Sequence, residues 1–303
     1  MGLATLLLIG LALTWAICIA GTIVVLTRPP RRTYASAVAK GRPGEPSELD
    51  TPLEFTEWKL EPEGCPVWDI TGLDPSGPVV VMTHGWADSR VGALVRIPAF
   101  AGLASRIIAW DLPGHGEAPG ACRLGTQEPE LLKRLLDRVV QGDGARPLLF
   151  LYGWSLGAGV SIAAATDPAF AGRIAGIIAE APYRLPKTPA RRVLHLKRLP
   201  VKPVVPPAFA LLGLRFGVGP GWRAFDRAEF ARALSCPLLV LHGAEDEVCP
   251  IEDGREIAKA APAGKLLEIT GGNHNTLWTD PETGPRCAEG VRAFLERVAS
   301  GDL

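Results

Sequence analysis

One pentapeptide in the chain combines a nucleophilic side chain with two glycines. Gly153-Trp154-Ser155-Leu156-Gly157 follows the apolar run PLLFLY and leads into SLGAGVSIAAAT, which has the pattern of a helix. A serine on a tight strand-to-helix turn is forced outward, and the flanking glycines relieve the crowding that side chains would create there. The following helix supplies an amide and a positive dipole end for a developing oxyanion. The motif therefore predicts Ser155 as a nucleophile.

A serine hydroxyl is a poor nucleophile unless a neighbouring base takes its proton. Five histidines are present, at positions 84, 115, 195, 242 and 274. Where a serine occupies such a turn, the chain order is nucleophile, then acid, then histidine. Only His274 follows the last predicted strand, in the loop GGNHN, whose glycines allow an imidazole to enter the site. We predict His274 as the base, and we expect His84 to support a turn.

The acid that orients this imidazole should follow the preceding strand, CPLLVLHG. A carboxylate beside the imidazole fixes the Nδ1–H tautomer and stabilises the imidazolium that forms in the transition state. Asp246 is the predicted acid, because it stands three residues beyond the end of that run. Glu245, Glu247 and Asp253 are the alternatives, and the two glutamates are expected to be solvated loop charges.

Two backbone amides are expected to bind the oxyanion. One is the amide of Leu156, which follows the nucleophile, and the other comes from the loop after the run PVVVMT, for which we choose Trp86. Losing one such donor typically costs about 10²–10³ in turnover. The side chains of Trp86 and Trp154 either line the pocket or belong to the core, and the sequence leaves both interpretations open.

Alternating strand and helix signals must position these groups. LEFTEWKL alternates as a half-buried strand does, whereas PVVVMTHG, SRIIAWD, PLLFLYG, RIAGIIAEA, CPLLVLHG and KLLEIT are short apolar runs typical of buried strands. PELLKRLLDRVV, SLGAGVSIAAAT and GPRCAEGVRAFLERVAS have helical patterns. We predict an α/β fold, with a mostly parallel sheet of about eight strands covered by helices on both faces. In such sheets the site lies at the carboxyl ends of the strands.

Composition narrows the function classes. The chain of 303 residues is 47% hydrophobic and 21% charged, with a formal net charge of zero, which argues against a nucleic-acid-binding protein. None of the six cysteines lies in a C-x-x-C pair, and no His/Cys cluster has metal-ligand spacing. We therefore expect reduced, mostly buried thiols and no metal site.

The first residues predict a membrane anchor. Residues 3–26 carry no charged side chain, and a helix of that length is about 36 Å long, enough to cross a hydrocarbon core of about 30 Å. A cleaved signal peptide usually has a basic start and a shorter apolar run, so we favour a transmembrane helix over residues 1–27. Basic residues follow the helix and none precedes it, so the positive-inside rule predicts a single-pass protein with a cytoplasmic catalytic domain. A long domain after a single span can break this rule, and the alternative is a catalytic domain that faces outward on the same anchor.

Two further segments are predicted around the catalytic part. Residues 28–50 are rich in proline, glycine and charge, as a linker is, and residues 51–303 form the catalytic domain. A cap insertion is expected at about 183–228. The stretch from 181 to 225 has no acidic residue and carries the basic residues Arg184, Lys187, Arg191, Arg192, Lys197, Arg198, Lys202, Arg215 and Arg223. Two interpretations are open: a solvated basic cap, or a cap that lies on an anionic membrane and admits a lipid chain.

Five motifs carry a family resemblance. THGWADS, DLPGHGEAP, GWSLGAG, HGAEDEVCP and GGNHN resemble the successive signatures of alpha/beta-hydrolase superfamily serine hydrolases, in the branch of monoglyceride lipases, lysophospholipases and serine aminopeptidase-like proteins. The resemblance covers residues 79–298 and breaks at the cap. It implies ester, thioester or amide hydrolysis without metal or organic cofactor. Ser155 in place of an aspartate argues against the dehalogenases and epoxide hydrolases of this fold, and Cys249 departs from the small or β-branched residue common before Pro250.

Together these features predict a membrane-bound serine hydrolase that cleaves an acyl ester or thioester. The substrate is expected to be a small acyl ester or a lipid-like molecule. An acyltransferase with the same three residues and a non-catalytic binding protein of the same fold are the alternatives. Loss of labelling by a fluorophosphonate probe on replacement of Ser155 distinguishes an enzyme from a binding protein.

Overall fold

An eight-stranded sheet lies at the centre of the computed structural model, which describes residues 2–140, 148–196, 198 and 201–302. The strand order within these residues is β1-β2-β4-β3-β5-β6-β7-β8. β2 runs antiparallel to β1 and β4, and all other neighbours are parallel, so the predicted, mostly parallel sheet is confirmed. The strands are β1 (Phe55–Leu60), β2 (Cys65–Thr71), β3 (Val79–Thr83), β4 (Arg106–Trp110), β5 (Leu149–Trp154), β6 (Ile174–Glu180), β7 (Leu238–Gly243) and β8 (Gly264–Ile269).

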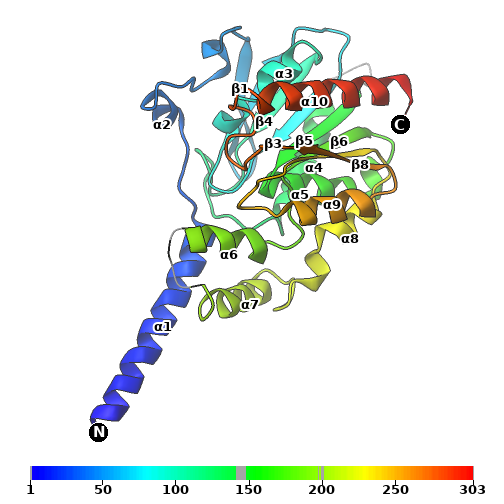
Figure 1. Cartoon of the computed structure of the whole chain (residues 1–303). Coiled ribbons are helices and arrows are strands. Elements are labelled where there is room, and N and C mark those ends of the chain that lie inside the picture. The colour runs from blue at the N-terminus through cyan, green and yellow to red at the C-terminus, as the bar shows by residue number, and fades with distance from the viewer. Residues whose placement is uncertain (1, 141–147, 197, 199–200, 303) are drawn as a thin grey trace.

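Helices cover both faces of the sheet, as predicted (Figure 1). One face carries α3 (Ile97–Ala101) and α10 (Thr283–Ser300). The other face carries α4 (Glu128–Val140), α5 (Leu156–Ala165), α8 (Arg227–Arg232) and α9 (Ile251–Ala260). Each face buries its own apolar cluster against strands that are buried along most of their length, which is why these strands are continuous apolar runs in the sequence.

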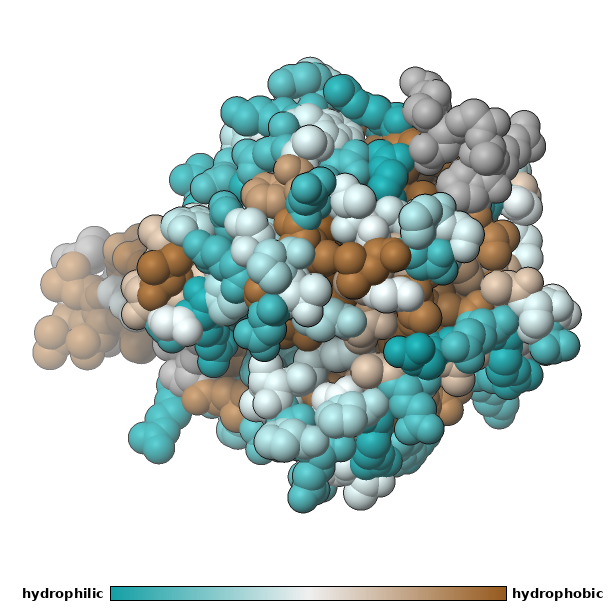
Figure 2. All heavy atoms as spheres, turned by 90° about the horizontal axis from the view of Figure 1, so that it is seen from above, coloured by the Kyte–Doolittle hydropathy of each residue, from teal (hydrophilic) through white to brown (hydrophobic). Residues whose placement is uncertain are grey.

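The amino-terminal helix α1 (Leu3–Thr27) projects from this body (Figure 1). It is long and apolar enough to cross a membrane. Its side chains are largely exposed up to the last three turns, and Leu13, for example, is 59% exposed. The view in Figure 2 shows many hydrophilic side chains on the body and a hydrophobic surface on the projecting helix. The exposed apolar surface of the molecule is therefore concentrated on α1.

Residues 28–50, the predicted linker, contact the catalytic part. They contain α2 (Tyr34–Val38) and the short 3₁₀ helix η1 (Pro46–Glu48). The Arg31 guanidinium donates to the carbonyl oxygens of Gly116 and Ala118 at 3.1 and 2.8 Å. Further 3₁₀ helices are η2 (Arg90–Ala93), η3 (Pro168–Phe170) and η4 (Arg223–Phe225).

Between β6 and α8 lie the helices α6 (Lys187–Leu196) and α7 (Val205–Arg215), in the segment for which a cap was predicted. α7 packs along α1, where Val204 and Ala208 bury Ile19. The indole of Trp15, well inside α1, donates to the carbonyl of Pro203. Arg184 forms ion pairs with Asp226 and Glu256, so this member of the basic set is neutralised within the protein. Lys197 lies outside the described residues.

Candidate active site

Ser155 occupies the predicted turn between β5 and α5. Its backbone has φ 54° and ψ −110°, in the left-handed region of φ that most L-residues avoid, and its amide donates to the Glu180 carbonyl at 2.8 Å. A Cβ on Gly153 would lie 2.3 Å from the Gly157 carbonyl oxygen, and one on Gly157 would lie 1.9 Å from that of Thr83. Both glycines are therefore required by close backbone contacts, and the turn is strained as a nucleophile elbow is.

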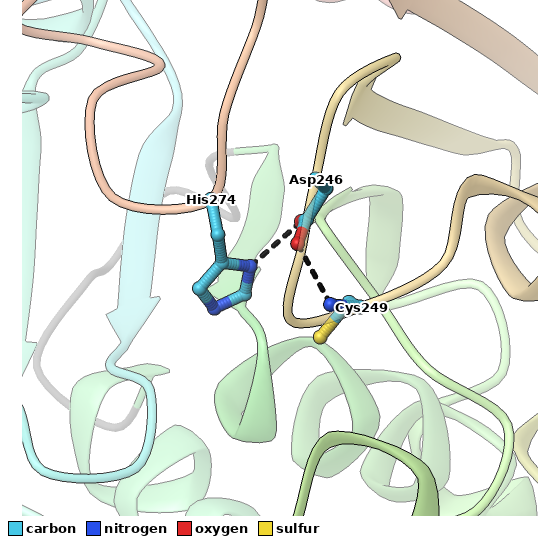
Figure 3. A group of neighbouring side chains, drawn as sticks. All are labelled: Asp246, Cys249 and His274. Atoms are coloured by element: carbon cyan, nitrogen blue, oxygen red, sulfur yellow. Dashed lines mark hydrogen bonds and ion pairs between the residues drawn. The ribbon is translucent and has the colours of Figure 1, made fainter. Parts of the chain in front are cut away.

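The predicted acid and base lie together at the same edge of the sheet. Asp246, after β7, and His274, after β8, face each other, and His274 Nδ1 donates to Asp246 Oδ2 at 2.7 Å (Figure 3). The other oxygen of Asp246 accepts the amides of Val248 and Cys249 at 2.8 and 2.7 Å. This arrangement leaves Nε2 of His274 as the nitrogen available to a serine hydroxyl.

The surroundings shift the pKa values of both groups. Burial alone would raise the pKa of Asp246, but the neighbouring His242 and the hydrogen bonds from His274 and the Cys249 amide lower it well below its ordinary value. Burial alone would lower the pKa of His274, but Cys249 and the Asp246 carboxylate raise it above 6.5. Asp246 is therefore a carboxylate at neutral pH, and its charge favours the imidazolium that forms when His274 accepts a proton.

Ser155 and His274 line one cavity of about 210 Å³. Among the described residues, the side-chain partner of the Ser155 hydroxyl is the Cys249 thiol, with 4.0 Å between Oγ and Sγ, and there is no direct hydrogen bond to His274. Hydrogen bonds between catalytic groups are often long in the absence of substrate. The structure thus brings the predicted acid and base into contact and has the predicted nucleophile in the same cavity, without joining all three.

Two neighbours of Asp246 were not predicted from the sequence. His242, the penultimate residue of β7, lies with Nε2 3.6 Å from Asp246 Oδ2 and donates to the Cys249 carbonyl at 3.0 Å. The sequence signal for His242 is its position four residues before Asp246 at the end of a strand. Cys249 was noted only as a departure from the family pattern. Its thiol is fully buried beside Ser155, and burial raises the pKa of this thiol.

The two amides predicted to bind an oxyanion have no acceptor among the described residues. Leu156 is the first residue of α5, where an amide has no intrahelical partner, and Trp86 lies in the turn after β3. The β3 loop approaches the nucleophile closely, because a Cβ on Gly85 would lie 3.3 Å from the Ser155 Cβ. Both amides are therefore free to donate to a substrate oxygen.

The two tryptophans near the nucleophile differ in role. Trp86 lines the cavity, and its indole donates to the Leu26 carbonyl at 3.0 Å. Trp154 is buried in the core, where its indole donates to Asp88 at 3.1 Å and the Arg96 guanidinium lies 4.1 Å from its ring centroid. Of the two alternatives that the sequence left open, Trp86 is a pocket residue and Trp154 is a core residue.

The other histidines lie outside the cavity. His84 is fully buried and accepts the Leu112 amide at 2.9 Å, so it supports the turn as predicted. His115 packs against it, and burial lowers the pKa of His115 to about 3. His195 is exposed on α6.

A buried ion pair supports the turn that carries Ser155. Arg96 donates to Glu180 at 2.7 and 2.5 Å, and both side chains are buried. Glu180 also accepts hydrogen bonds from Tyr152 and from the Trp278 indole. Because the carbonyl of Glu180 accepts the Ser155 amide, this network fixes the residue that anchors the turn.

The cluster of Asp246, Cys249 and His274 also has the residue types of a metal site. Their ligand atoms lie within 4.8 Å of one another. Asp246 is already occupied by the imidazole and two amides, which is the arrangement of an acid that orients a base. The cluster therefore matches the arrangement predicted for the acid and the base.

The cavity is lined mainly by apolar side chains. The α6 segment contributes Pro186, Pro189, Ala190, Val193 and Leu194. Val25 and Leu26, at the carboxyl end of α1, line the same cavity, and Arg32 and Asn275 add polar groups. A volume of about 210 Å³ is below the 300–1,000 Å³ typical of sites that enclose a drug-sized ligand. The cavity is therefore small and largely apolar.

Comparisons with known proteins agree with this architecture. The esterase Pf2001 of Pyrococcus furiosus has 21% identity and a TM-score of 0.67, over 90% of this chain and 98% of that chain. A membrane phospholipase A, described as a bacterial virulence factor, has 18% identity and a TM-score of 0.62, over 97% and 99% of the two chains. At these identities the likeness establishes the fold.

Sequence comparisons give a family. The bifunctional esterase/perhydrolase DCH of Acinetobacter calcoaceticus is 38% identical over 64 residues, a match that spans 20% of this chain and 23% of that protein. The model of the alpha/beta hydrolase family matches residues 80–283, which include the turn at Ser155, Asp246 and His274. The chain therefore belongs to the alpha/beta hydrolase family.

Proposed function

We propose that this protein is a serine hydrolase, of carboxylesterase or lipase type, that cleaves a carboxylic ester or thioester through an acyl-enzyme on Ser155. The observation that carries the proposal is the Asp246–His274 hydrogen bond of 2.7 Å, formed at the cavity that also contains the strained nucleophile turn. Strain of this kind is retained where the surrounding structure enforces it, as it is at functional sites.

The proposed reaction follows from the positions of these groups. His274 Nε2 takes the proton of Ser155 Oγ as the oxygen attacks the acyl carbonyl, and the amides of Trp86 and Leu156 donate to the resulting oxyanion. The imidazolium, stabilised by Asp246, then gives its proton to the departing alcohol or thiol, which leaves an acyl-enzyme. Water repeats the cycle with His274 as base and releases the carboxylic acid and free Ser155.

The proposed substrate has a lipid-like acyl group. The residues that α6 contributes to the cavity wall are apolar, and Ser155 and His274 line the same cavity. The structural neighbours include an esterase and a membrane phospholipase A, which is consistent with ester substrates of this kind. A single chain fits the small cavity better than a whole two-chain lipid does.

The proposed location is a membrane, with α1 as a single-pass anchor. α7 contacts α1 around Ile19, within the span, and its outward side chains Leu211 and Leu214 are 51% and 63% exposed. We infer that the cap lies against the membrane beside α1, where the exposed basic residues of α6 favour anionic lipid. The basic residues after α1 support a catalytic part on the cytoplasmic side. Protease protection of the carboxyl terminus in sealed vesicles tests that orientation.

Labelling by a fluorophosphonate probe tests the proposed chemistry. Wild-type protein and Ser300→Ala, which removes an exposed serine at the end of α10, are expected to be labelled equally. Ser155→Ala is expected to lose labelling and to lower ester turnover by about 10⁴-fold or more. Labelling of the Ser155→Ala protein would exclude this residue as the nucleophile. An unlabelled wild-type protein would favour the binding-protein alternative, and acyl transfer in place of hydrolysis would favour the acyltransferase.

A further inference from the structure

The carboxyl end of α1 is built into the catalytic body. Leu26 is only 6% exposed and belongs to the same apolar cluster as Leu124 and Leu194, whereas Leu13 on the same helix is 59% exposed. A helix that served only as a tether would need no such contact. The last turn of α1 is therefore packed as a core element.

Backbone groups of this turn are bound by the catalytic part. The Leu26 carbonyl accepts the Trp86 indole N–H at 3.0 Å, and the Thr27 carbonyl accepts the Cys122 amide at 2.9 Å. Carbonyl groups at the end of a helix have no intrahelical partner, and here the active-site loops supply the donors. The position of α1 is thus fixed relative to the loop that carries the predicted oxyanion donor Trp86.

The chain beyond α1 extends this connection. Arg32 forms an ion pair with Asp88 at 3.2 Å, and Asp88 in turn accepts the Trp154 indole N–H at 3.1 Å. Trp154 precedes the nucleophile and Asp88 follows Trp86 by two residues. The segment 26–32 therefore contacts the loop after β3 at two residues, Trp86 and Asp88, and is connected to Trp154 through Asp88.

The geometry points to α1 as a wall of the acyl-binding pocket, so that the anchor helix itself determines which acyl chains the enzyme accepts. Val25 and Leu26 line the cavity that contains Ser155 and His274. The inference rests on the proposed hydrolysis at Ser155 and adds to it the substrate class, an amphiphile whose chain lies against the end of the anchor. Because α1 is apolar and exposed up to the point where it enters the body, such a chain reaches the cavity from the membrane side.

Two adjacent valines provide a matched test. Val25 lines the cavity, and Val24 does not, although the two side chains are similarly exposed, at 40% and 53%. A tryptophan at position 25 therefore adds bulk to the pocket, whereas one at position 24 adds the same bulk to the helix surface outside it.

The experiment measures kcat/KM for p-nitrophenyl esters from acetate to palmitate, with the full chain in detergent micelles. In Val25→Trp, the ratio of the long-chain to the acetate value is expected to fall about tenfold or more, because adding or removing pocket volume of this kind changes discrimination by that order. Val24→Trp is expected to keep the wild-type ratio. Val25→Ala, which enlarges the pocket, is expected to shift the ratio toward longer chains.

The inference is overturned if Val25→Trp and Val24→Trp have the same chain-length profile. If Val25→Trp does not fold, a wild-type profile for Val25→Ala overturns it instead. The proposed function is judged separately by Ser155→Ala. Loss of hydrolysis in Ser155→Ala together with unchanged profiles at position 25 would remove only the role of α1. Persistence of hydrolysis in Ser155→Ala would remove the proposed nucleophile itself.

Discussion

The two sides of the cavity are built in different ways. On the catalytic edge, Ser155, Asp246 and His274 come from turns after three parallel strands, and Asp246 is bound by an imidazole and two amides. On the other side, which we call the wall, α6 and the end of α1 present mostly apolar side chains. They are held by packing against the core and by contacts with Trp86. One side is a network of directed hydrogen bonds, and the other is an apolar surface.

This difference suggests that one side of the cavity determines the rate of the reaction and the other side determines which ester is preferred. Hydrogen-bonded and buried polar groups tolerate little change, because removal of one partner leaves the other unsatisfied. Apolar walls tolerate changes in shape and volume at modest cost. We therefore expect substitutions on the catalytic edge to reduce turnover for every ester, and substitutions on the wall to change which ester is preferred.

The largest effect is expected for Asp246→Asn. The amide keeps the shape of the side chain but stabilises the wrong tautomer of His274 and removes the charge that stabilises the imidazolium, so kcat should fall by about 10⁴-fold. Glu245→Gln, one residue away on an exposed side chain, should retain wild-type activity. Steady-state kinetics on a short ester measure both. A loss of less than tenfold in Asp246→Asn would contradict the division between the two sides.

Removal of the ion pair below the nucleophile turn should be the largest effect on stability. Arg96→Met leaves the Glu180 carboxylate buried without its cation, which typically costs about 3–5 kcal/mol. Arg191→Met, at an exposed position of α6, should change the free energy of unfolding by about 0.5 kcal/mol or less. Urea unfolding of the full chain in detergent, followed by tryptophan fluorescence, compares them. Equal stabilities would show that the edge is no more constrained than the wall.

The catalytic edge was the more predictable side, for a local reason. The nucleophile turn, the acid loop and the histidine loop are each recognisable in a few residues next to an apolar run, and a parallel sheet brings the carboxyl ends of its strands together. Asp246 was selected over Glu245, Glu247 and Asp253 by its position alone, and it is the carboxylate that contacts His274. The catalytic roles themselves stay predictions that the kinetics above test.

The wall could not be predicted because its contacts join distant parts of the chain. The bond between Leu26 and Trp86 spans 60 positions, and no local pattern encodes it. Residues 28–50 have the composition of a linker, yet Arg31 and Arg32 bind the catalytic part. Composition indicates the local flexibility of a segment but not which residues it contacts. For this reason the end of α1 and the residues after it were predicted only as an anchor and a linker.

Two elements were not predicted because their local sequence is not typical of a strand or a helix. β2, with the sequence CPVWDIT, was not predicted, because a proline and an aspartate interrupt its apolar run. It is nonetheless paired along its length, since the antiparallel neighbours β1 and β4 lie on either side of it. α9, which was also not predicted, contains a glycine, and glycine lowers helix propensity. Tertiary contacts decided both elements.

The pH dependence of kcat/KM tests whether the charge of Asp246 raises the pKa of His274. His274 acts as a base only when neutral, and its surroundings raise its pKa above 6.5. Activity should therefore decline below a midpoint that lies above pH 6.5, by about tenfold for each further unit of pH. Val25→Trp, on the wall, should keep the wild-type midpoint, and Asp246→Asn should move it to lower pH, because the anionic partner that favours imidazolium is lost. A midpoint at or below pH 6.5 in the wild type would contradict the arrangement.

The smallest expected effect concerns the outer surface of the wall. Lys187 and Arg191 are exposed on α6, and neither forms an ion pair within the described residues, so they are available to anionic headgroups. Each should contribute about 1 kcal/mol, or roughly a fivefold preference for anionic lipid at low salt. The ratio of phosphatidylglycerol to phosphatidylcholine retained by the full chain in mixed micelles measures this preference.

The double variant Lys187→Gln/Arg191→Gln should lose most of that preference without any change in kcat on a short ester. Its matched control is Arg292→Gln/Arg297→Gln, which removes the same charge from exposed positions of α10, on the face of the sheet away from the cap (Figure 1). High salt should abolish the difference between the two variants, because the charges involved are solvated. If both variants retained the lipids equally, the basic cap would be an ordinary solvated surface, and the role of the wall would be confined to the pocket that it encloses.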